Sequence, residues 1–189
     1  MEDRKVYQPK SENQNERKII LALNQPLTAK QIAAKTGIPK DTCSHQMAKF
    51  VRNHLAICLN PIAGNTRVYW LTENGQKFRE ELCMESNLRH TDFILPNLNW
   101  ELYGWICFNQ RSVVLRALTE PMQPSQIRRR IKNRFASTKI TSNNIRDVIR
   151  LLEKQGVVQK VFVGKRIRPK YELTETGLQF QKLLNNVPN

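Results

Sequence analysis

The sequence predicts a mainly α-helical protein with small β elements, an α+β chain, built from two copies of one unit. Three observations carry this prediction: an internal repeat, apolar residues at helical spacing between proline and glycine breaks, and two short strand-like runs late in each copy. The segment 71–78 (LTENGQKF) matches the segment 173–180 (LTETGLQF), and the same separation of 102 residues pairs Tyr69 with Tyr171. Ordered similarity at a fixed separation is typical of a duplicated structural unit.

The changing separation between matched residues also shows that one copy contains an insertion. Near the start of each copy the separation falls to 95 residues, which pairs Pro26 with Pro121 and Gln31 with Gln126. The second copy therefore holds seven extra residues, in the stretch 128–139. The predicted organisation is a flexible N-terminus over residues 1–14, a first domain over 15–85, an aromatic-rich connecting segment over 86–110 and a second domain over 111–185.

The first copy begins with two helices. An apolar run around Ile19 predicts a short helix that ends before Pro26, because proline cannot continue a helix. Thr28 and Gln31 have the spacing of a capping box, in which each residue satisfies a free amide of the other. This pair predicts a second helix over residues 29–35.

A third helix and a pair of strands complete the first copy. Gly37 supplies a tight turn, and Pro39, as a favoured first-turn residue, starts the helix. Its apolar residues follow the spacing i, i+4, i+7 and i+8, which predicts one buried stripe: Cys43, Met47, Phe50 and Val51. Strands are expected over residues 55–59 and 66–71, and Thr72 then caps a final helix that runs to about Met84.

The second copy predicts the same elements in the same order. Gly156 ends its third helix, as glycine often does at a helix C-terminus, and the buried stripe of that helix is Ile145, Ile149 and Leu152. The expected helices cover residues 111–118, 125–133 and 142–155, the strands cover 157–163 and 170–173, and a closing helix begins near Glu175.

The connecting segment is distinguished by its aromatic residues, and Pro96 is a candidate helix start. Aromatic side chains favour both interfaces and cores. We therefore expect the stretch 96–108 either to pack between the domains or onto a second subunit of a homodimer, or to complete the core of the second domain. The residues concerned are Trp100, Tyr103, Trp105 and Phe108.

Charge narrows the class of partner. The 189 residues carry a net charge of +15, and the stretch 96–189 holds 17 basic against 6 acidic side chains. Such a balance favours a polyanion, either a nucleic acid or an anionic membrane surface. The sequence has no apolar run of about 18 residues and no signal peptide, so we expect no membrane anchor and a cytoplasmic, nucleoid-associated protein with reduced cysteines.

Helix, helix, turn, helix and a two-stranded ribbon is the order of a winged helix-turn-helix, whose third helix enters the DNA major groove. The motifs Gly37-Ile38-Pro39 and Ser44-His45-Gln46-Met47 resemble the recognition-helix segment of the ArsR and MarR classes of bacterial and archaeal repressors. The stretches 57–61 and 67–75 are similar to the strand–wing–strand–helix signature of archaeal regulators, and 100–103 is similar to a segment of archaeal tandem winged-helix proteins. The resemblance implies two tandem winged helix-turn-helix domains that bind double-stranded DNA.

Candidate DNA-binding residues follow from this geometry. Asparagine and arginine read adenine and guanine edges, and lysine and arginine bind phosphates. The alternative for each group is an ordinary solvated face. The first recognition helix offers Thr42, Ser44, His45, Gln46, Lys49 and Arg52, and the second offers Ser142, Asn143, Asn144, Arg146 and Arg150, with Asp147 as an unfavourable acidic neighbour. The first wing offers Arg67, the second wing offers Lys165, Arg166 and Arg168, and the basic run 128–134 offers Arg128 and Arg129.

Other chemistry has little support in the sequence. The cysteines and histidines have no recognised metal-ligand spacing, and no phosphate-binding glycine loop or hydrolase motif occurs. We therefore expect no metal, no cofactor and no enzymatic activity. A transcription regulator is the leading hypothesis, and a plasmid or viral replication initiator and a winged-helix protein-interaction scaffold are the alternatives.

The charge of the second wing gives a first testable prediction. Replacing Lys165, Arg166 and Arg168 by alanine should weaken duplex binding and flatten its log–log salt dependence by about one unit per lost phosphate contact. Fluorescence anisotropy over a salt series measures both quantities. An unchanged affinity would favour the protein-interaction scaffold.

Overall fold

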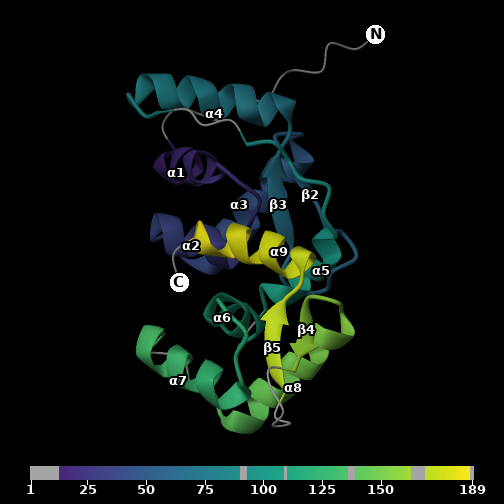
Figure 1. The fold of residues 1–189 in the computed structure, drawn as a ribbon. Helices are drawn as coiled ribbons and strands as arrows, with labels where there is room; N and C mark the ends of the chain where they lie inside the picture. The colour runs from purple at the N-terminus through teal and green to yellow at the C-terminus, as the bar shows by residue number, and fades with distance from the viewer. Residues whose placement is uncertain (1–12, 90–92, 109, 136–138, 163–168, 188–189) are drawn as a thin grey trace. The chain divides into compact units, whose positions relative to one another are not determined.

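The protein is described by a computed structural model that covers residues 13–89, 93–108, 110–135, 139–162 and 169–187. It is mainly helical with two small antiparallel sheets, in agreement with the α+β class that the sequence predicts (Figure 1). The chain divides into two compact units between Trp105 and Ile106. This division falls inside α5 (Trp100–Ile106), within the predicted connecting segment.

The first unit begins with α1 (Gln14–Ala22), whose start is fixed by Asn13. The side-chain carbonyl of Asn13 accepts hydrogen bonds from the amides of Asn15 and Glu16, as expected of an N-cap. The helix therefore begins before residue 15, and the predicted boundary between a tail over 1–14 and the first domain does not hold at residues 13 and 14. Residues 1–12 lie outside the described part of the chain.

The helices α2 (Ala29–Thr36) and α3 (Lys40–Arg52) occupy the predicted positions. The capping box is confirmed: the Thr28 amide donates to Gln31 Oε1 over 2.8 Å, and the Gln31 amide donates to Thr28 Oγ1. Pro39 is the N-cap of α3 and not a first-turn residue, with ψ of 140°. The buried stripe holds for Cys43, Met47 and Phe50, whereas Val51 is partly exposed.

The sheet of the first unit contains a strand that the sequence did not predict. The strands β2 (Ala56–Cys58) and β3 (Val68–Leu71) pair with Ala56 opposite Leu71, and β1 (Leu27–Thr28) adds to the other edge of β3. β1 has two residues, so it carries no alternating pattern by which a strand is recognised. The closing helix α4 (Glu73–Glu85) then packs on α1.

The second unit repeats this order. Its helices are α6 (Gln110–Ala117), α7 (Pro124–Arg134), α8 (Ser142–Lys154) and α9 (Glu175–Asn185), and β4 (Val158–Val161) pairs with β5 (Lys170–Leu173). In place of β1, Met122 forms a single bridge to Tyr171. Leu27 and Tyr69, which pair in the first unit, stand at the corresponding repeat positions. The repeat in sequence is thus also a repeat in strand pairing.

The strongest structural likeness between the units is the junction that precedes each closing helix. We call the sequences Thr72–Gly75 and Thr174–Gly177 the TExG junctions. A Cβ atom on Gly75 would lie 2.0 Å from the Leu55 carbonyl oxygen, and one on Gly177 would lie 2.2 Å from the Val157 carbonyl oxygen. The absence of a side chain therefore lets each closing helix touch the backbone directly after the third helix.

The threonine of each junction makes the same bonds twice. Thr72 Oγ1 donates to the His54 carbonyl over 2.7 Å, and Thr174 Oγ1 donates to the Gly156 carbonyl over 2.7 Å. Both acceptor residues have positive φ, 58° at His54 and 68° at Gly156. The backbone must reverse there to bring its carbonyl to the threonine, and glycine adopts this conformation without strain.

A basic side chain links the first two helices in each unit. Lys35 Nζ donates to the Ala22 carbonyl over 2.8 Å and to Asn24 Oδ1 over 2.6 Å. Burial, and next the charge of Arg79, lower the pKa of Lys35. Arg130 takes the same place in the second unit and donates to the Ala117 carbonyl and to Thr119 Oγ1.

The connecting segment contributes to the first unit through α5. Asn99 caps this helix, since its Oδ1 accepts from the Leu102 amide over 2.9 Å, so the helix start expected at Pro96 is wrong. Tyr103 is fully buried, and a Cβ atom on Gly104 would lie 2.2 Å from Asn60 Nδ2 in the β2–β3 loop. The side chain of Glu101 accepts from the Ile62 amide in the same loop.

The TExG junctions give a second prediction. Gly75→Ala and Gly177→Ala should each lower the free energy of unfolding by about 2 kcal/mol or more, because the backbone carbonyl cannot move away from the new methyl group. Urea denaturation followed by circular dichroism measures this loss. Gly64→Ala is the matched control, since a Cβ atom there meets nothing within 4 Å, and its stability should stay within about 0.5 kcal/mol of the parent.

Candidate nucleic-acid interface

The polar face of α3 is smaller than the sequence indicates. His45 and Arg52 are exposed, whereas Thr42, Ser44 and Gln46 are partly buried. Gln46 Oε1 is a buried atom without a hydrogen-bond partner in the described residues. The exposed predicted residues of this helix are therefore His45 and Arg52.

Lys49, the remaining predicted residue of α3, is engaged inside the fold. Its ammonium group contacts Glu16 Oε1 over 2.6 Å, and the Glu16 side chain is only 2% exposed. Asn13 Nδ2 donates to the same carboxylate oxygen over 3.2 Å. The charge of Lys49 is thus neutralised by α1, and we leave this residue out of the interface.

The first wing, the loop between β2 and β3, is organised by the buried Asn60. Its Oδ1 accepts from the Val68 amide over 2.6 Å, and its Nδ2 donates to the Thr66 carbonyl over 3.1 Å. Arg67 is exposed and its side chain hydrogen-bonds Tyr69, which is 7% exposed. Burial raises the pKa of Tyr69 and the charge of Cys58 adds to the rise, whereas the charge of Arg67 and then its hydrogen bond lower the pKa.

The polar face of α8 is the larger of the two. Asn143, Asn144, Arg146 and Arg150 are exposed and Ser142 is partly exposed. The opposite side of the helix is an unbroken apolar stripe of Ile145, Val148, Ile149 and Leu152, all buried. Thr141 caps the helix by accepting from the Asn144 amide.

Several contacts restrain this face without removing it from solvent, and one of them is the bond that Arg146 Nη1 donates to Asn143 Oδ1 over 3.5 Å. Asn144 Nδ2 donates to Gln110 Oε1 over 3.1 Å, which ties it to α6. Arg150 lies 3.6 Å from Asp147, and both side chains are more than half exposed. An exposed pair at that distance contributes little, so Arg150 can exchange this partner for another anion.

The basic run on α7 does not form a uniform charged face. Arg129 is exposed, whereas Arg128 is partly buried, with an Nε atom that makes no hydrogen bond within the described residues. Arg130 is paired with Glu120 over 2.6 Å. Lys132 and Arg134 are exposed and extend the charge toward the end of the helix.

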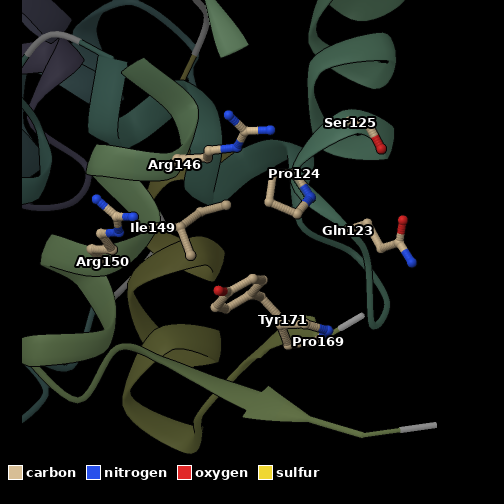
Figure 2. A pocket seen from close by; sticks show the side chains of 8 residues that line it. All are labelled: Gln123, Pro124, Ser125, Arg146, Ile149, Arg150, Pro169 and Tyr171. Atoms are coloured by element: carbon tan, nitrogen blue, oxygen red, sulfur yellow. The ribbon is translucent and has the colours of Figure 1, made fainter. Parts of the chain in front are cut away.

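A cleft of about 450 Å³ opens beside α8 in the second unit. Its lining combines apolar and polar side chains, and Tyr171, from β5, is its aromatic residue (Figure 2). Sequence reasoning assigned Tyr171 only to a strand, although the repeat register held the signal: Pro169 stands where the first copy has Arg67. The full lining is Gln123, Pro124, Ser125, Arg146, Ile149, Arg150, Pro169 and Tyr171.

Three predicted residues are not placed. Lys165, Arg166 and Arg168 of the second wing lie outside the described residues. Within the described residues, no three histidine, cysteine, aspartate or glutamate side chains gather into a possible metal site. In the same part of the chain, no helix combines the length and the apolar character needed to cross a membrane.

Comparison with known proteins adds no relative: the chain matches no protein-family model, no curated protein and no solved structure.

The Lys49–Glu16 pair gives a third prediction. Lys49→Met should lower the free energy of unfolding by about 2 kcal/mol, because it leaves a buried carboxylate without its cation. Thermal and urea denaturation measure the loss. Lys40→Met, an exposed lysine at the start of the same helix, is the control and should be nearly neutral. Equal stability of the two variants would contradict a structural role for Lys49.

Proposed function

We propose that the protein is a DNA-binding transcription regulator in which each unit acts as a winged helix domain. The element order supports this proposal, since each unit runs helix, helix, helix, two strands and helix, with a third strand or a single bridge on the ribbon. In such domains the third helix enters the major groove and the ribbon loop contacts the backbone. Here α3 and α8 take the place of the recognition helix.

The observation that carries the proposal is the two-sided character of α8. Four buried apolar residues hold one side against the unit, and exposed amides and guanidiniums line the other. Asparagine can pair with adenine and arginine with guanine in the major groove. A helix that only covered a core would not need these groups together on its exposed face.

The two units contribute unequally under this proposal. Lys49 is neutralised by Glu16 and the exposed cation at the end of α3 is Arg52, whereas α7 and α8 expose Arg129, Arg146 and Arg150. Phosphate attraction is supplied by free cations, because each neutralised phosphate releases counterions. We assign most of the affinity to the second unit and a smaller, base-reading role to the first.

A fourth prediction separates base reading from phosphate binding. Asn143→Ala should weaken binding to a selected duplex by about tenfold and leave binding to unrelated duplexes unchanged, since an amide reads a base edge. Arg129→Ala should weaken all duplexes alike and reduce the salt slope by about one. Anisotropy with selected and scrambled duplexes measures both.

Lys154→Ala, at the far end of α8, is the control for a lost surface charge and should change neither affinity nor slope strongly. Duplex binding that is absent even at low salt, or that shows no sequence preference after selection from genomic fragments, would refute the regulator.

A further inference from the structure

The cleft beside α8 combines features that reading a duplex groove does not require. Its lining combines an aromatic residue, apolar residues and two arginines. We propose that it seats a single unstacked nucleotide, with the base against Tyr171 and the phosphate at Arg146 and Arg150. If that nucleotide is part of a DNA strand, this inference rests on the proposed function and adds a site for one unstacked base to it.

The walls of the cleft suit a planar ring. Figure 2 shows the side chains of Ile149, Pro124 and Tyr171 around the hollow, from α8, the start of α7 and β5. Pro169 adds a further apolar surface beside Tyr171. A volume of about 450 Å³ lies within the range of small-ligand sites and admits a base, a sugar and a phosphate. Bases stack on aromatic side chains whatever their sequence, because every base has a flat π-face.

The rim of the cleft suits the rest of a nucleotide. Arg146 and Arg150 lie one helical turn apart on α8, and both residues line the cleft. Arginine binds phosphate through two parallel N–H bonds, which a lysine cannot do. Ser125, on α7, also lines the cleft, and its hydroxyl can bond the polar edge of a base.

The first unit provides an internal comparison, because the repeat places an equivalent residue at each position. Tyr69 stands in the place of Tyr171 and is 7% exposed, with the side chain of Arg67 bonded to it. Pro169 replaces that arginine in the second unit, and Tyr171 is more exposed.

Two arginines of α8, in contrast, are present only in the second copy. The first unit has Ser44 and Ala48 at the positions of Arg146 and Arg150. The second copy therefore lacks the arginine that bonds the tyrosine and has two arginines in the lining of the cleft that Tyr171 also lines. Stacking requires an accessible aromatic ring and phosphate binding requires cations, and the second copy has both along one cleft.

The test uses the full chain and three probes: 5′-AMP, a short single-stranded oligo(dT) and a blunt duplex. Calorimetry measures binding of 5′-AMP, and anisotropy measures binding of the two DNAs. Tyr171→Leu should weaken 5′-AMP and oligo(dT) by at least about tenfold through lost stacking, and should leave duplex affinity unchanged. Lys154→Gln is the control for the folded unit and should change none of the three.

A second variant distinguishes lost stacking from misfolding and from a general change in positive charge. Pro169→Arg restores the arrangement of the first unit, with an arginine that can bond the tyrosine. It should weaken 5′-AMP and oligo(dT) although it adds a positive charge. An increase in affinity would mean that the region only attracts anions, and it would overturn the proposal.

The remaining outcomes are also decisive. Failure of 5′-AMP and oligo(dT) to bind while the duplex binds would overturn the nucleotide cleft and leave the proposed function standing. Nucleotide binding that depends on Tyr171 without any duplex binding would support the cleft and refute the regulator. Tighter Tyr171-dependent binding of oligo(dT) than of 5′-AMP would identify a DNA strand as the source, and the reverse order would identify a free nucleotide.

Discussion

Each unit depends on a close contact between a glycine and a backbone carbonyl. Gly75 and Gly177 let the first turn of the closing helix rest on the carbonyls of Leu55 and Val157, and these carbonyls also accept the amides of Thr72 and Thr174. One contact thereby fixes the end of the third helix, the ribbon and the closing helix together. Packing at this distance leaves no room for a methyl group, so only glycine fits at these two positions.

A fixed frame of this kind lets the surface residues of the two copies diverge. Lys35 and Arg130 make corresponding bonds with different chemistry, and the frame around them is unchanged. The neighbours of Tyr69 and Tyr171 differ more, since Arg67 is replaced by Pro169 and Ser44 by Arg146. These positions are exposed or partly exposed, where substitution costs little stability. The basic character and the cleft of the second unit are therefore changes made on a common core.

Most of the secondary structure could be predicted from the sequence because the signals that start and end helices are local. Capping threonines, a glycine at the end of a helix and apolar spacing act within a few residues, and Thr28, Gly37 and the stripe of α8 appear where they are predicted. Two of the wrong predictions, the absence of β1 and the start of α5, also have local causes. β1 is too short to show a pattern, and Asn99 caps α5 with a side-chain bond that competes with the weaker signal of Pro96.

The sequence by itself determined that the chain is a basic, mainly helical duplication, and it located both candidate recognition helices. Only the tertiary structure decided which polar residues are free. Lys49 looks available on a helical wheel, but α1 brings Glu16 to within 2.6 Å of it, across a separation in sequence that no periodicity encodes. The cleft around Tyr171 likewise joins residues from α7, α8 and β5, because packing rather than sequence spacing sets which side chains meet.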